Sequence, residues 1–91
     1  MGTQAADLTV AVQDYLKAIY ALESAGERAT TSALAARMRV SAPSATAMTK
    51  RLAELDLVER SPYRGVVLTD EGRRRALEVL RHHRLLELYL V

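Results

Sequence analysis

Two residues near the end of the sequence have side chains that can bind a divalent metal ion. His83 and Glu87 lie four residues apart in the stretch RHHRLLE, which covers residues 81–87. On an α-helix this spacing places both side chains on one face, and neutral imidazole and carboxylate are suitable ligands for Fe(II) or Mn(II). Such pairs also occur as ordinary solvated pairs on helix surfaces, and spacing alone favours that second interpretation.

Basic residues are unevenly distributed along this 91-residue chain, whose formal net charge is only +2. Residues 1–27 include four acidic residues and one basic residue, whereas residues 28–53 include five basic residues and no acidic one. A basic surface of this kind suits the phosphates of a nucleic acid, because each neutralised phosphate releases a condensed counterion. The alternative is that the five basic side chains are simply solvated.

Composition excludes several classes of protein. A chain of 91 residues forms one small domain with a modest core. Cysteine is absent, so a disulfide framework and a thiolate metal site are both impossible. The sequence has no window apolar enough to span a bilayer and no signal-peptide pattern, so we expect a cytoplasmic protein. We do not expect an enzyme, because no set of nucleophile, base and oxyanion donors is visible.

Hydrophobic periodicity predicts two helices in the first 38 residues. Apolar residues recur at steps of three and four between residues 8 and 22, which describes one face of an amphipathic helix that Gly26 ends. A second, shorter helix follows the stretch TTS at residues 30–32, where any of the three hydroxyl side chains can cap it. This helix runs to about Met38.

A tight turn separates the second helix from a third one. Ser41 is a suitable N-cap, and Pro43 fits the first helical turn, where its missing N–H leaves no hydrogen bond unmade. The third helix continues to about Leu55, so the second and third helices fit a helix-turn-helix. Arg39 occupies a turn position where glycine is common, and it carries strain of about 1 kcal/mol if that position requires a positive φ.

A β-hairpin and a last helix complete the predicted fold. The stretch LVER is typical of a short strand, SPYRG of a turn, and VVL of a returning strand rich in β-branched residues. Thr69 can cap a helix over residues 70–91, in which we predict the three arginines at 73–75 to form a solvated face. The predicted fold class is therefore mainly α with a small β-hairpin, as in a winged helix-turn-helix.

The start of the third helix is suited to the major groove of DNA. Small side chains let a helix approach the base edges, where Pro43 and Ala47 can touch thymine methyl groups. Lys50 and Arg51 suit backbone phosphates, and Arg64 lies at the hairpin tip, where a wing meets DNA. The helix start has no Arg, Asn or Gln for a bidentate base contact, so we expect specificity to depend on methyl contacts and DNA shape. The alternative is that the small residues only cap and pack the helix.

Three stretches together resemble the amino-terminal part of the diphtheria-toxin-repressor family of metal-dependent transcriptional regulators. They are DYLKAIYALE, TTSALAARMRVSAPSATAMTKRLAELDLVE and PYRGVVLTDEGRRRALEVLRHHRLLE, and the likeness begins at about Val10. Members of that family are homodimers that bind inverted-repeat operators and repress iron- or manganese-uptake genes when Fe(II) or Mn(II) is bound. The resemblance implies a DNA-binding domain at residues 1–77 and the truncated beginning of a dimerisation and metal-binding domain at residues 78–91.

The resemblance also implies roles for residues of the DNA-binding domain. Ser41 and Pro43 match residues that approach thymine methyl groups in the family. Ala47 and Glu54 stand where some members have Gln and Arg, so the operator preference of this chain is expected to differ. The positions that match phosphate-contacting residues are Thr31, Ser44, Thr46, Arg51 and Arg64.

Three residues match metal ligands of the family. His83 and Glu87 match ligands of one metal site, and Asp14 matches a ligand of a second site. Aspartate at this position is typical of manganese-type members, but Lys17 stands where those members often have glutamate. The resemblance therefore implies Mn(II) or Fe(II) as the cofactor, with further ligands on a helix that this sequence lacks.

Two other functions are compatible with the same residues. One is a metal-independent winged-helix transcriptional regulator. The other is a winged-helix protein-interaction module, in which the third helix packs on a partner protein. Salt-dependent binding of nonspecific duplex DNA would argue against the interaction module.

Overall fold

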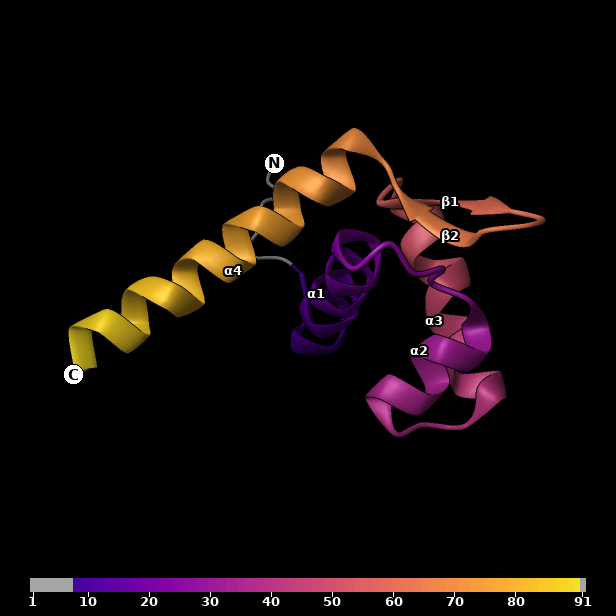
Figure 1. Cartoon of the computed structure of the whole chain (residues 1–91), viewed down its shortest axis with the longest axis horizontal. Coiled ribbons are helices and arrows are strands. Elements are labelled where there is room, and N and C mark those ends of the chain that lie inside the picture. Colours follow the sequence, from indigo (N-terminus) through magenta and orange to yellow (C-terminus); the bar gives the residue numbers. More distant parts are fainter. Residues whose placement is uncertain (1–7, 91) are drawn as a thin grey trace.

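The computed structural model describes the backbone of residues 8–90 and the side chains of residues 8–82. Figure 1 shows the earlier helices gathered beside a hairpin, with the last helix extending away from the hairpin as a long rod. The fold class predicted from the sequence, mainly α with a small β-hairpin, is confirmed. The elements are α1 (Val10–Ser24), α2 (Thr31–Met38), α3 (Ala42–Glu54), β1 (Val58–Ser61), β2 (Gly65–Leu68) and α4 (Asp70–Leu90).

Hydroxyl side chains cap all four helices: Thr9 caps α1, and the other three caps are those that the sequence predicts. Thr30, Ser41 and Thr69 each accept a hydrogen bond from the backbone N–H three residues later, at 3.0, 3.2 and 2.9 Å. Of the three capping candidates before α2, Thr30 is therefore the residue that caps it. Each bond satisfies one of the N–H groups that a helix start leaves unpaired.

The apolar face of α1 is the centre of the hydrophobic core. Leu16 and Ile19 have no exposed surface, and burial of such a side chain contributes about 1.5–3 kcal/mol to stability. α1 contacts α4, α2 and β2, so it connects the helix-turn-helix with the last helix. Other elements contribute the core residues Leu34, Leu52, Leu57, Val58, Val66, Leu68 and Ala76.

Two residues that are not glycine adopt the left-handed conformation. Arg39 has a φ of 59° and a ψ of 47° at the end of α2, which confirms the conformation anticipated from the sequence. Asp56, at the turn between α3 and β1, has a φ of 62° and was not anticipated. A side chain with a Cβ atom is strained in this region by about 1–2 kcal/mol.

We expect the substitution Arg39→Gly to raise the free energy of unfolding by about 0.5–1 kcal/mol, because glycine removes the left-handed strain. Urea denaturation monitored by circular dichroism measures the change. Arg37→Gly is the matched control, since residue 37 lies inside α2 and glycine there should destabilise the protein by about 1 kcal/mol. A loss of stability in both variants would contradict the assignment of strain to Arg39.

The hairpin has a third backbone partner from outside its two strands. β1 and β2 pair antiparallel from Val58 with Leu68 to Ser61 with Gly65. Ala29, in the connection between α1 and α2, forms bridges with β2, and its carbonyl oxygen accepts a hydrogen bond from the Val66 N–H at 3.0 Å. The connection therefore runs along the free edge of the hairpin.

Gly65 permits this close approach of the two backbones. Its φ is 75°, and a Cβ atom at this position would collide with the carbonyl group of Ala29. Gly26 has the same φ, but a Cβ atom there would meet no other group within 4 Å. Gly65 thus satisfies a steric requirement as well as a conformational one.

We expect Gly65→Ala to lower the free energy of unfolding by about 2 kcal/mol or more, because strain and collision add. Gly26→Ala should lower it by about 1 kcal/mol, from the backbone conformation alone. Thermal and urea unfolding of the two variants give the comparison. Equal losses would show that the approach of Ala29 to the hairpin is not a constraint.

All three arginines of residues 73–75 are paired with acids. The predicted solvated face holds for Arg73 and Arg74, whose side chains are 43% and 58% exposed, but is wrong for Arg75. Arg73 lies 3.3 Å from Glu23, Arg74 lies 2.7 Å from Glu71, and Arg75 lies 2.8 Å from Glu71. Only 14% of the Arg75 side chain is exposed. Hydrogen bonds from Arg75 and Arg74 hold the pKa of the Glu71 carboxyl group below its ordinary value. The pair of Arg73 with Glu23 joins α4 to α1, whereas the two pairs of Glu71 lie within α4.

Candidate nucleic-acid interface and metal ligands

One face of α3 carries the residues that the sequence predicts for DNA contact. Ala45, Thr49 and Leu52 are buried on the opposite face, so the helix is held against the core through positions three and four residues apart. The predicted residues share the outward face because they recur at the same helical spacing. The exposed residues of α3 and its cap are Ser41, Ala42, Pro43, Ser44, Ala47, Lys50, Arg51 and Glu54.

The hydroxyl groups at the start of α3 are not equivalent. Ser41 Oγ accepts the Ser44 N–H as the helix cap and also donates its proton to Ser44 Oγ at 3.0 Å. The Ser44 hydroxyl is therefore an acceptor within the cap, and its own proton is available to an outside acceptor such as a phosphate oxygen. In contrast, the Thr49 hydroxyl is buried and donates to the Thr46 carbonyl oxygen at 2.8 Å.

Two further predicted positions flank this surface. Thr46 is half-buried on α3, next to the outward face. Thr31 is half-buried and is the first residue of α2, immediately after its capping residue. Thr46 thus lies beside the exposed face of α3, and Thr31 lies at the start of α2. That either residue contacts a phosphate stays a prediction.

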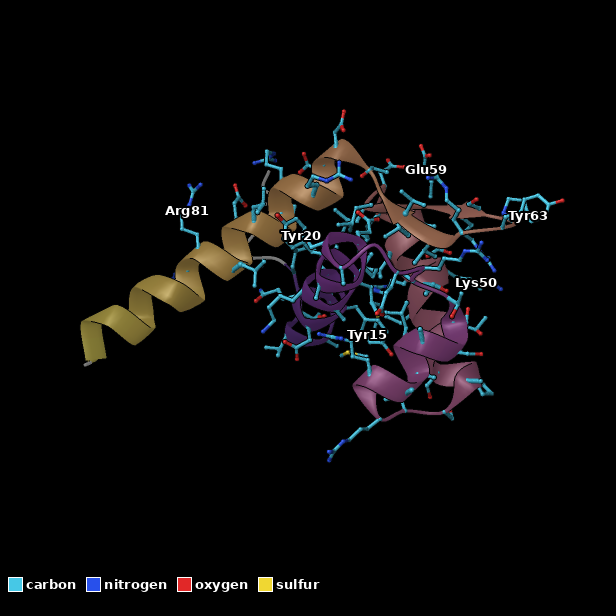
Figure 2. The ribbon with its side chains drawn as sticks, in the orientation of Figure 1. Tyr15, Tyr20, Lys50, Glu59, Tyr63 and Arg81 are labelled. Atoms are coloured by element: carbon cyan, nitrogen blue, oxygen red, sulfur yellow. The ribbon has the colours of Figure 1, made fainter. Side chains whose placement is uncertain are left out.

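The turn of the hairpin provides a second exposed surface. Arg64 is exposed there, as the sequence predicts. Tyr63 is 83% exposed, and Figure 2 shows it extending from the hairpin tip away from the helices. Lys50 of α3 is labelled on the same side of the molecule in that view. Tyr63 was not predicted to belong to this surface, although it lies between Pro62 and Arg64 in the predicted turn.

Asp14 lies on α1 in a different part of the molecule. Its side chain is 44% exposed, and Lys17 Nζ lies 3.4 Å from Asp14 Oδ1. Both side chains line a recess of about 420 Å³, whose other lining residues include Arg37, Met38 and Leu80. The carboxylate of Asp14 suits a hard divalent cation, but such a cation would compete with the ammonium group of Lys17.

The other two predicted metal ligands, His83 and Glu87, lie outside the residues whose side chains the structure describes. Their backbone belongs to α4, and Leu80, which lines the recess of Asp14, lies three residues before His83. Within the described part of the chain, no group of three His, Asp or Glu residues is arranged to hold a metal ion. Asp14 is therefore one suitable donor, and the rest of the ligand set stays a prediction.

Comparison with known proteins agrees with this arrangement. Helices α2 and α3 with the adjoining hairpin are the elements of a winged-helix DNA-binding domain. Residues 7–66 match the family described as "Iron dependent repressor, N-terminal DNA binding domain", and the chain belongs to this family. The resemblance noted from the sequence is thereby confirmed.

Individual relatives give the same result. The transcriptional regulator MntR of Escherichia coli O6:H1 is 39% identical over 80 residues, which is 88% of this chain and 52% of that protein. The diphtheria toxin repressor of Corynebacterium glutamicum is 37% identical over 81 residues, which is 89% of this chain and 36% of that protein. The chain thus spans about half, or less, of the length of these relatives.

A solved structure supports the fold. The manganese regulator SloR superimposes with a TM-score of 0.76 at 39% sequence identity, covering 87% of this chain and 37% of that one. The three matched proteins are all named as regulators or repressors, a class that generally lacks enzymatic activity. Among residues 8–90, no helix is long and apolar enough to cross a membrane.

Proposed function

We propose that this chain is the DNA-binding part of a Mn(II)- or Fe(II)-dependent transcriptional repressor of metal-homeostasis genes. The observation that carries the proposal is the outward face of α3, where small residues at the helix start are followed by two exposed basic residues. Membership of a family defined by a DNA-binding domain supports the same function. A repressor of this kind works in the cytoplasm.

The proposed binding mode places the start of α3 in the major groove. Pro43 and Ala47 are exposed and small, so they let the helix approach thymine methyl groups closely. The free proton of the Ser44 hydroxyl and the charges of Lys50 and Arg51 then hold the backbone phosphates on either side. Arg64 contacts the backbone or the minor groove from the wing.

Metal dependence is proposed to involve Asp14, His83 and Glu87. A bound metal ion would supply a link between α1 and the proposed dimerisation domain that begins at residue 78. The link fixes the separation of two α3 helices, so that they fit half-sites about one turn of DNA apart. The carboxylate of Asp14 favours Mn(II). Its contact with the ammonium group of Lys17 weakens this preference, so Fe(II) remains the alternative ion.

We expect Arg51→Ala to weaken duplex binding on all sequences and to reduce the slope of log K against log salt by about 0.9, because one phosphate contact is lost. Fluorescence anisotropy at several salt concentrations measures both quantities. Arg81→Ala is a control of equal charge, since Arg81 is exposed on α4, far from α3 in Figure 2. An unchanged slope for Arg51→Ala would contradict the proposed docking of α3.

The metal proposal is tested by anaerobic calorimetric titration with Mn(II). We expect a binding heat for the wild-type chain that disappears in His83→Ala and weakens in Asp14→Ala. His82→Ala is the matched control, because His82 is adjacent and exposed and should not affect binding. Equal binding by the wild type and His83→Ala, or no binding by the wild type, would contradict a site that uses His83 in this chain.

A further inference from the structure

A second recess lies at the root of the hairpin, away from Asp14. Its volume is about 430 Å³, and its walls come from the end of α1, the connection between α1 and α2, β2 and the start of α4. Figure 1 shows these elements meeting where the connection passes beside the hairpin. The residues that matter for its chemistry are Glu23, Glu27, Arg28, Arg64 and Arg73.

Backbone pairing brings two of these arginines together. Ala29 forms a parallel bridge with Gly65 and an antiparallel bridge with Val66, and Arg28 and Arg64 are the residues immediately before Ala29 and Gly65. Paired backbones lie about 4.8 Å apart, so the two arginines start from neighbouring positions. Both are exposed, and both line the recess.

The acids of the recess do not neutralise this pair of arginines. Glu23 accepts hydrogen bonds from the Leu68 N–H at 2.8 Å and from Arg73 at 3.3 Å, so its charge is already balanced. Glu27 is exposed beside Arg28. Within residues 8–82, neither Arg28 nor Arg64 has a carboxylate oxygen within 4.0 Å. Two arginines that line one recess without a carboxylate partner of their own favour an anion bound to both.

The position of the pair indicates which anion it binds. Arg28 lies two residues before Thr30, the cap of α2, and Arg64 lies in the exposed turn of the hairpin. Thr31, the first residue of α2, and Arg64, in the wing, are both predicted phosphate contacts. Arg28 therefore lies between two segments with predicted phosphate contacts, in a connection for which the sequence predicts no function.

We propose that Arg28 and Arg64 jointly bind one backbone phosphate of DNA, which adds the connection between α1 and α2 to the DNA-binding surface. This inference rests on the proposed DNA-binding function. A planar guanidinium group can donate two parallel hydrogen bonds to a phosphate, and two such groups can hold its oxygens from two sides. The contact positions the duplex and carries no base information.

The test uses a duplex that the wild-type chain selects from a random-sequence library. We expect Arg28→Ala to raise the Kd about 3- to 10-fold and to reduce the salt slope by about 0.9. Arg28→Lys keeps the positive charge but lacks the planar guanidinium group, so it should raise the Kd less than Arg28→Ala does. Arg81→Ala serves again as the control of equal charge, and thermal unfolding of each variant shows that the fold is retained.

A double substitution tests whether the phosphate is shared. If Arg28 and Arg64 hold one phosphate, the loss in Arg28→Ala/Arg64→Ala will be smaller than the product of the two single losses. Losses that multiply would overturn the shared site, as would an Arg28→Ala variant that binds like the wild type. If Arg51→Ala still lowers the salt slope in that case, only this inference fails. Salt-independent binding, or none, by the wild-type chain would instead remove the proposed function.

Discussion

Burial of the apolar face of α1 is the constraint on which the rest of the structure depends. Leu16 and Ile19 are fully enclosed, and the helix contacts α2, β2 and α4. The helix-turn-helix, the hairpin and the last helix are all placed by packing against this one surface. Because protein interiors are closely packed, a shift of α1 cannot be absorbed locally and moves the elements around it. A displacement of α1 is therefore passed on to the helix-turn-helix and the hairpin.

The two ends of α1 have different electrostatic surroundings. Asp14, in the first half of the helix, is paired with Lys17 and lines an open recess. Glu23, near the other end, is half-buried and holds the Leu68 N–H of β2 and Arg73 of α4. One helix thus carries both the candidate metal ligand and the carboxylate that fixes the hairpin and α4. In the proposed function, a metal ion at Asp14 would therefore be coupled through α1 to the hairpin and α4.

Features that depend on a few adjacent residues could be predicted from the sequence. The caps at Thr30 and Ser41, the left-handed Arg39 and the outward face of α3 all follow from local rules of conformation and periodicity. The pairing of Arg73 with Glu23 could not be predicted, because 50 residues separate them and only the folded chain brings them together. The bridge from Ala29 to the hairpin was missed for the same reason, and with it the placement of Arg28. The roles of His83 and Glu87 depend on residues whose side chains the structure does not describe.

The connection between α1 and α2 has a fixed length. Within its six residues, 25–30, Gly26 turns the chain, Ala29 bonds to Val66, and Thr30 caps the next helix. An insertion or deletion of one residue would break the register of at least one of these contacts, whereas an exposed position such as 27 tolerates replacement. Loops generally accept changes in length more readily than the elements they join. In this connection, substitutions of exposed side chains are expected to be tolerated, whereas insertions and deletions are not.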